Sequence, residues 1–169
     1  MAALSIEAFI NEVFMMADLY FSEPDKVRAL WVDLEREPTL EKFQVALGLK
    51  DKERMDKGAA IYQNADTLIK LRDALTHFKP EWSDEKIVHK QIEARIKSKF
   101  PLSPFFLSDS IFPEKCMTYG CAEWCISAAF EFVNSFCEKS SIENRYLRHT
   151  HHLTYHLIQN VAAPGSPAQ

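Results

Sequence analysis

Apolar residues recur along the first part of this chain at intervals of three and four, the spacing of one face of an α-helix. This pattern begins at residue 5 and continues to residue 22, through Ile6, Phe9, Ile10, Val13, Ala17 and Tyr20. Ser5 is the expected N-cap, with Leu4 and Phe9 spaced as a hydrophobic staple. No stretch alternates apolar and polar residues over more than a few positions, so the pattern predicts helices rather than strands.

Prolines, glycines and capping residues divide the rest of the chain into further helices. The expected helices run from Pro24 to just before Pro38, from Thr39 to Leu47 (before Gly48), from Asp51 to near Lys79, from Ser83 to before Pro101, from Lys115 to Lys139 and from Ile142 to near Val161. Residues 101–114 combine turn formers with phenylalanines, which predicts an irregular loop. We expect Phe105, Phe106 and Phe112 to pack on the core, and a base-stacking surface is the alternative.

Length and composition indicate one all-α domain. A chain of 169 residues, 47% of them hydrophobic, can bury a full core without disulfides or metals. We expect a helical bundle of about six to seven helices over residues 1–162, followed by a flexible tail at residues 163–169. The segment 115–139 is apolar on most of its circumference, which predicts the central helix of the bundle.

Charge and cysteine content restrict the function classes. The formal net charge of −4 argues against general electrostatic binding of nucleic acid, and no DNA partner is expected. No run approaches the roughly 20 apolar residues that cross a bilayer, so no membrane partner is expected. The four cysteines form no CxxC pair. We therefore expect a cytoplasmic protein with reduced thiols.

The most distinctive chemical pattern is Leu-Arg-Asp-Ala-Leu-Thr-His at residues 71–77, near the end of a predicted helix. Asp73 and His77 are one turn apart, so the carboxylate can orient the imidazole for general acid–base chemistry. Arg72 points about 140° away from His77 in an uninterrupted helix. The two therefore meet at one substrate phosphate only if the helix loosens there or a second chain completes the site.

An Arg-polar-x-x-x-His motif at a helix end, in an all-helical domain of this size, resembles the signature of the HEPN superfamily. The resemblance implies a metal-independent endoribonuclease of the toxin or phage-defence kind that acts as a homodimer, without a cofactor. It implies His77 as general acid and base, Arg72 as the group that stabilises phosphate charge, and Asp73 as the residue that positions His77. Thr76 and Lys79 would bind substrate. RNA is then the expected partner, and a cognate antitoxin is compatible with this assignment.

Two other interpretations of the same residues stay open. The chain is alternatively a non-catalytic helical module for protein interaction or for nucleotide or RNA binding. In that case Arg72 and Asp73 form a surface salt bridge, and His77 interacts with the helix dipole. Arg145 and His151 form a second match to the motif, which ranks lower because Tyr146 stands where a small polar residue is expected.

The remaining histidines and cysteines carry weaker signals. His149, His152 and His156 share one helical face at a spacing that can bind zinc, but no HExxH arrangement accompanies them. We expect no metal site there, and instead a polar face at an interface or extra donors to RNA phosphate. Cys121 and Cys125 are one turn apart and are expected to be packed core thiols, since no base is placed beside them.

Overall fold

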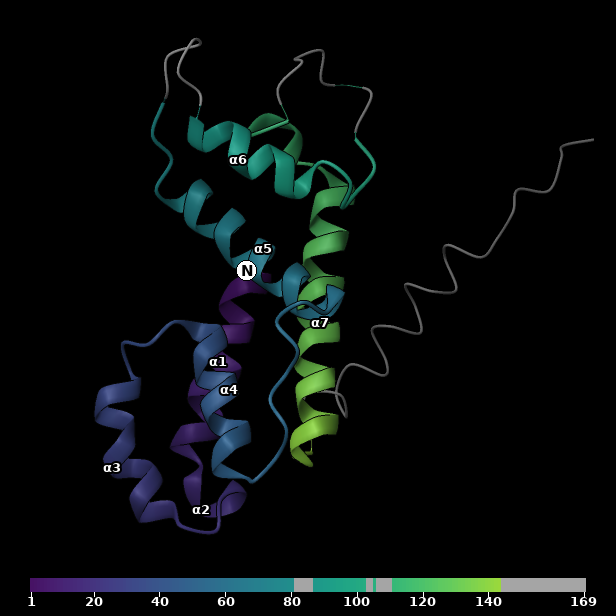
Figure 1. Ribbon diagram of the computed structural model, residues 1–169. Helices are drawn as coiled ribbons and strands as arrows, with labels where there is room; N and C mark the ends of the chain where they lie inside the picture. The colour runs from purple at the N-terminus through teal and green to yellow at the C-terminus, as the bar shows by residue number, and fades with distance from the viewer. Residues whose placement is uncertain (81–86, 103–104, 106–110, 144–169) are drawn as a thin grey trace, which may run out of the picture.

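The computed structural model describes residues 1–80, 87–102, 105 and 111–143. This part of the chain contains only helices, which confirms the all-α prediction (Figure 1). They are α1 (Ala2–Met15), α2 (Ala17–Tyr20), α3 (Pro24–Leu34), α4 (Thr39–Leu49), α5 (Ala60–Thr76), α6 (Ile87–Ile96), a 3-10 helix η1 (Glu114–Cys116) and α7 (Tyr119–Ser140). None of these described helices is both long and apolar enough to cross a membrane.

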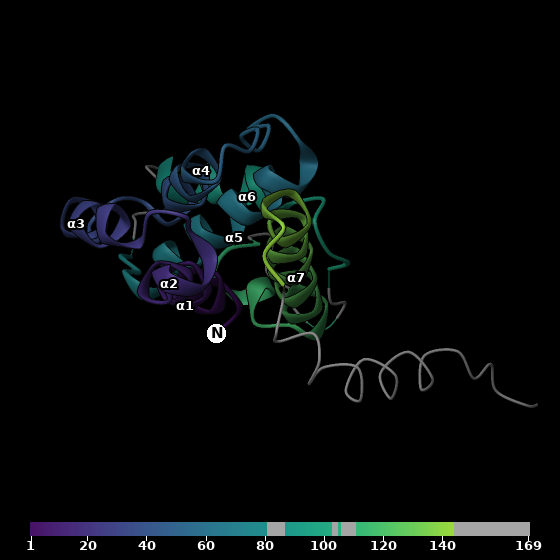
Figure 2. The same ribbon diagram turned by 90° about the horizontal axis from the view of Figure 1, so that it is seen from below.

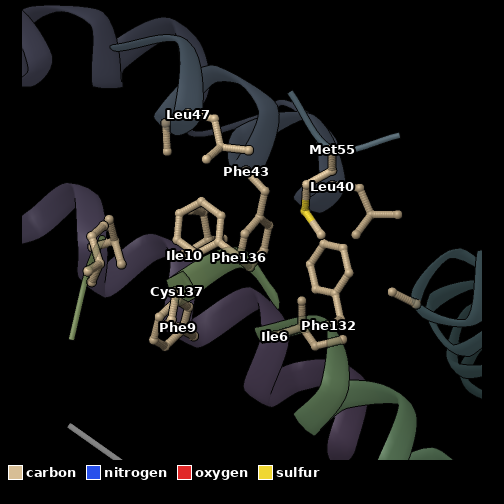
Figure 3. Close-up of a cluster of buried hydrophobic side chains, with 14 of the residues drawn as sticks. Ile6, Phe9, Ile10, Leu40, Phe43, Leu47, Met55, Phe132, Phe136 and Cys137 are labelled. Atoms are coloured by element: carbon tan, nitrogen blue, oxygen red, sulfur yellow. The ribbon is translucent and has the colours of Figure 1, made fainter. Parts of the chain in front are cut away.

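Among the described residues, helices α1, α4, α5 and α7 contribute most of the larger of two hydrophobic cores, which has aromatic rings at its centre (Figure 3). The ring of Phe43 meets the rings of Phe132 and Phe136 edge-on, each at a centroid distance of 4.8 Å. Phe9 stacks on the same ring at 6.2 Å. Edge-to-face and offset contacts of this kind add to the gain from burying the rings. Phe43 therefore joins α1 and α7 through α4.

A second, smaller core lies where α5 ends. Leu71 from α5 packs there with Ile92 and Ile96 from α6, with Phe112, and with Cys121 at the start of α7. Glu93 of α6 accepts hydrogen bonds from the backbone N–H groups of Ile111 and Phe112, at 2.8 and 3.0 Å. These bonds hold the segment before η1 against α6.

Helix α7 is the element common to both cores. Trp124 and Cys125, in its first half, pack against each of them. In both ribbon views α7 is a long helix alongside α5 and the α1/α4 pair (Figures 1 and 2). The central helix predicted at residues 115–139 is therefore confirmed in role, although it runs from Tyr119 to Ser140 and Lys115 belongs to η1.

The predicted first helix is wrong in its boundaries. The segment expected as one helix over residues 5–22 is divided at Met16, where φ is −93° and ψ is 40°. Met1 rather than Ser5 precedes the first turn. The Ser5 hydroxyl donates instead to the carbonyl of Ala2 at 2.7 Å. A serine inside a helix can satisfy its hydroxyl in this way, and apolar spacing does not distinguish that position from a cap.

The helix predicted from Asp51 begins nine residues later, at Ala60. In the intervening segment, the Gln44 side chain takes the place of helical backbone bonds. Its amide oxygen accepts from the N–H of Met55 at 3.0 Å, and its amide nitrogen donates to the Met55 carbonyl at 3.1 Å. Asp51 starts the departure with a left-handed φ of 53°. Gly48 does not stop the preceding helix, which continues to Leu49. The two hydrogen bonds between Gln44 and Met55 cannot be predicted from the spacing of hydrophobic residues.

The prediction that phenylalanines of residues 101–114 pack on the core is correct for Phe112 and wrong for Phe105. Phe112 is buried, as expected of a core residue, whereas Phe105 is 89% exposed. Phe106 lies outside the described residues, as do the expected start at Ser83 and most of the expected helix over residues 142–161. Glu114 already belongs to η1, so the irregular segment is shorter than predicted.

Lys42 is a buried cation that the sequence pattern did not reveal. Its side chain lies in α4 and is only 3% exposed. Its Nζ donates to Asn11 Oδ1 at 3.1 Å and to the Glu35 carbonyl at 2.9 Å, and it lies over the Trp31 ring. A buried ammonium is tolerated because these acceptors and the ring replace its water. Lys42 thus ties α4 to α1 and to the end of α3.

Replacing Phe43 with alanine should lower the free energy of unfolding by about 3–5 kcal/mol, because it removes a fully buried ring and leaves a cavity among three others. Urea unfolding followed by circular dichroism measures the loss. Val32, which is 74% exposed on α3, provides the control, since Val32→Ala should change stability by less than about 0.5 kcal/mol. Equal effects of the two substitutions would contradict the placement of Phe43.

Candidate functional site

The motif predicted from the sequence occupies the last turns of α5 and the residue that follows. Leu71 is 2% exposed and packs in the smaller core, which fixes the rotation of this part of α5. Arg72 is half-buried, whereas Asp73, Thr76 and His77 are exposed. The motif thus lies at the margin of the smaller core, with its polar residues turned outward.

Arg72 is held between two carboxylates. Its Nη2 donates to Glu7 Oε2 of α1 at 3.4 Å, and its Nε lies 3.0 Å from Asp73 Oδ1. The Nε is buried and makes no hydrogen bond of acceptable geometry, so its contact with Asp73 is an ion pair by distance only. The guanidinium Nη1 has no hydrogen-bond partner among the described residues and is left for a further acceptor.

His77 stands where α5 stops. It is the C-cap residue, with φ −106° and ψ 35°, and its backbone N–H donates to the Asp73 carbonyl at 2.9 Å. The helix was expected to continue to about Lys79, so it ends about three residues early. The departure from helical geometry therefore takes place at His77 itself, and the imidazole lies in solvent.

The structure places the Asp73 carboxylate against Arg72, and the bond that it records between Asp73 and His77 is a backbone one. The permanent charge of the guanidinium favours this placement, because it attracts a carboxylate at every physiological pH. Thr76 and Lys79 have exposed side chains, and within the described residues neither side chain makes a hydrogen bond or ion pair with another motif residue.

The residues directly after His77 are anchored by α6. Phe78 stacks on the ring of His89 at a centroid distance of 5.3 Å, and both rings lie within 6.0 Å of Phe112. His89 is 7% exposed, and its Nε2 lies 3.1 Å from the Lys79 carbonyl. A carbonyl can only accept, so Nε2 carries the proton in this bond. His89 thus fixes the path of the chain as it leaves the motif.

Sequence reasoning missed both Glu7 and His89. A signal existed for His89, since it precedes Ile92 by three residues and Ile96 by seven and therefore shares their buried helical face. No local signal marks Glu7, which is 65 residues from Arg72 in the chain. That contact follows only from the packing of α1 near α5.

The other candidates from the sequence contribute little to this site. Arg145 and His151, and the histidines at 149, 152 and 156, lie outside the described residues. Within the described ranges, no three His, Cys, Asp or Glu side chains are grouped so as to hold a metal ion. A cavity of about 320 Å³ lies elsewhere, between Tyr20, Lys50 and Ser140 among others. Lys50 Nζ donates there to the Tyr20 carbonyl at 2.7 Å, which is a structural contact.

Three of the four cysteine thiols are poor nucleophiles. All four are free, and three of them are buried. The hydrogen bond with Cys116 raises the pKa of Cys121 to about 12, and burial raises the pKa of Cys137 to about 12. The pKa of Cys125 is also raised, first by its hydrogen bond with Cys121 and then by burial. The thiols of Cys121, Cys125 and Cys137 therefore stay protonated at neutral pH, which agrees with packed core thiols rather than a catalytic cysteine.

Comparison of the chain with protein-family models, with curated proteins and with solved structures finds no match.

The raised thiol pKa values predict slow alkylation in the folded protein. At pH 8, iodoacetamide should modify Cys121, Cys125 and Cys137 at least about tenfold more slowly than a free cysteine, because the reactive thiolate is scarce. The rate should increase as the pH rises. Peptide mass spectrometry measures each site, and urea-unfolded protein, in which all four thiols should react fully, serves as the control. Rapid modification of Cys121 in the folded chain would contradict this account.

Replacing His89 with leucine should destabilise the region that follows α5. The change fills the buried position with an apolar side chain but removes the donor to the Lys79 carbonyl, and we expect a loss of about 1–3 kcal/mol in unfolding free energy. Hydrogen exchange should be faster at the backbone amides of Phe78 and Lys79. Gln91→Leu, at an exposed position of the same helix, is the matched control and should leave both measurements unchanged. Unaltered hydrogen exchange in the His89→Leu variant would contradict the anchoring role of His89.

Proposed function

We propose that this protein is a metal-independent endoribonuclease of the HEPN kind that acts as a homodimer. The observation that carries the proposal is the setting of Arg72 and His77. A guanidinium held by two carboxylates, with one nitrogen unengaged, precedes by five residues an exposed imidazole at the point where the helix ends. These are the charge and the proton carrier that phosphodiester transfer needs.

The proposed reaction uses the ribose next to the cleaved bond. An imidazole accepts the proton of the 2′-hydroxyl, the 2′-oxygen forms a bond to phosphorus, and the bond from phosphorus to the 5′-oxygen breaks. A second imidazole, from the other copy of the chain, protonates the departing 5′-oxygen. Arg72 stabilises the added negative charge on the phosphate oxygens. The products are a cyclic phosphate and a 5′-hydroxyl, and no metal or cofactor takes part.

The contacts alter the role proposed for Asp73. Its carboxylate approaches Nε of Arg72, so we assign it to orient the guanidinium together with Glu7 rather than to orient His77. Thr76 and Lys79, both exposed beside His77, would contact the substrate. A homodimer brings a second copy of each group to the site, which a single straight helix does not do. A cognate antitoxin would act by covering this surface.

A non-catalytic interaction module is the second candidate, and one observation favours it. Glu7 and Asp73 together offset the charge of Arg72, as in a surface ion pair that serves only to join α1 and α5. Under this proposal the exposed side chains around His77 bind a partner without chemistry. The two candidates differ in whether RNA is cut.

The deciding experiment measures cleavage of a fluorescent single-stranded RNA in the presence of EDTA. We expect cutting that gives cyclic phosphate ends, and a loss of at least about a hundredfold in rate for His77→Ala and for Arg72→Ala. Both variants should unfold at nearly the wild-type urea concentration. Arg36→Ala, at an exposed arginine on another part of the surface, is the matched control and should retain full activity. No cutting by wild type, or equal cutting by wild type and His77→Ala, would favour the interaction module.

A further inference from the structure

A basic patch lies where α6 packs against α5 (Figure 1). Residues 87–99 contain four Lys or Arg and one Glu, although acids outnumber bases over the whole chain, 24 to 20. Two of these cations reach α5. Arg95 Nη1 donates to Asp66 Oδ2 at 3.2 Å, and Lys99 Nζ, just past the end of α6, donates to Asn64 Oδ1 at 2.7 Å. Because Asn64 and Asp66 are two positions apart on α5, the two cations lie close together.

Positive charge exceeds negative charge in this patch, since one carboxylate serves two cations. The oxygen of Asp66 that accepts from Arg95 also accepts from Lys70 Nζ, at 2.6 Å. Lys99 pairs with no carboxylate among the described residues, and its partner Asn64 is neutral. We call Lys70, Arg95 and Lys99, together with Asp66, the α5/α6 basic seam.

The opposite arrangement occurs on α3. There Arg28 is shared by two carboxylates, those of Asp18 and Asp25. An arginine in such surroundings has no residual attraction for an anion, because the carboxylates more than offset its charge. The α5/α6 basic seam keeps a net positive charge and therefore attracts one.

The seam is accessible to a ligand. The side chains of Lys70 and Arg95 are 44% and 42% exposed, and that of Asp66 is 25% exposed. Exposed ion pairs contribute little to stability, so a phosphate oxygen can replace Asp66 at one of the cations at small cost. Guanidinium and ammonium groups are the donors that proteins use to bind phosphate.

The seam is connected to the motif by one face of α5. Asp66, Lys70, Asp73 and His77 follow one another at intervals of four, three and four residues, so they share a face of the helix. Lys70 and His77 are therefore about 10 Å apart along the helix axis. The carboxylate of Asp73, which lies between them, has its charge offset by Arg72.

We propose that the α5/α6 basic seam binds the phosphate backbone of single-stranded RNA, at a nucleotide other than the one that is cut. The inference rests on the proposed ribonuclease in naming RNA as the ligand. A strand with a phosphate at Arg95 and Lys99 then follows the exposed face of α5 to His77. Because phosphate contacts carry no sequence information, the seam positions the strand and leaves the selection of bases to other residues.

The first test measures the binding of a fluorescent single-stranded RNA by anisotropy, in EDTA and with the His77→Ala protein, which should bind without cutting. Adding Arg95→Gln/Lys99→Gln should weaken binding at least about tenfold at low salt. It should also reduce the slope of log K against log salt concentration by about 1.4, the value for two phosphate contacts on a single strand.

The matched control is Lys26→Gln/Lys57→Gln, also in the His77→Ala protein. It removes two exposed lysines that each pair with one glutamate elsewhere on the surface, so it should change neither the affinity nor the slope. Equal binding by the seam variant and by this control would overturn the proposal.

The variant Asp66→Asn tests the seam by a gain of binding, which damage to the fold does not produce. Removing the shared carboxylate frees both Lys70 and Arg95, so the affinity for the same RNA should rise at least about threefold, with a steeper dependence on salt. Unchanged or weaker binding by Asp66→Asn would overturn the proposal.

The seam and the ribonuclease can fail separately. In cleavage assays Arg95→Gln/Lys99→Gln should raise KM with little change in kcat, because the phosphate contact is present both in the bound substrate and in the transition state. Binding of RNA through the seam without any cutting by the wild-type chain would overturn the ribonuclease only. Cutting with a KM that the seam variant leaves unchanged would overturn the seam only.

Discussion

The packing of α5 against α7 is the contact on which the rest of this structure depends. The first half of α5 contributes Tyr62, Ala65 and Leu68 to the larger core, and its next buried residue, Leu71, belongs to the smaller one. Helix α7 also contributes residues to both cores. Because Arg72 follows Leu71 directly, the rotation of α5 against α7 decides which side of the molecule presents the motif. The position of the candidate site is thus a result of core packing.

The carboxylates around Arg72 then determine how its guanidinium is oriented and how much of its charge is offset. A lone guanidinium at the edge of an apolar core would remain well hydrated and conformationally free. Glu7 from a distant segment and Asp73 from the neighbouring position restrict it instead, at the cost of offsetting part of its charge. Such an arrangement suits either a pre-oriented anion site or a simple tie between two helices. The chemistry of the exposed His77 is what separates these roles.

Much of the fold could be predicted from the chain because helical spacing and proline positions are local signals. Pro24 at the start of α3, Thr39 at the start of α4 and the C-terminal end of α7, to within one residue, all follow from them. The errors in helix boundaries arose where a side chain made a hydrogen bond with the backbone that the hydrophobic pattern does not indicate. Gln44 holds Met55 outside a helix, and the Ser5 hydroxyl bonds inside one. Such contacts have no period, so hydrophobic patterning cannot reveal them.

The location of the Arg72–His77 motif at a helix end was predictable, but the contacts of its side chains were not. The spacing of Arg72, Asp73 and His77 identified the helix end, and the structure brings the three to that end. The pairing could not be predicted because it depends on Glu7, which only tertiary packing delivers. His89 occupied a position readable as part of an apolar stripe, yet its role requires the aromatic contacts with Phe78 and Phe112. Long-range contacts therefore limited the prediction more than local chemistry did.

The unequal size of the two cores has a consequence for motion. Among the residues that the structure describes, the larger one contains 24 buried apolar residues and the smaller one eight, although both share α7. Fewer buried contacts mean a lower free energy for local opening. The region around α6, Phe112 and the end of α5 can thus separate while the larger core stays intact. Arg72 and His77 lie on the border between a stable frame and a part that opens more readily, so their surroundings can adjust to a bulky partner without unfolding the chain.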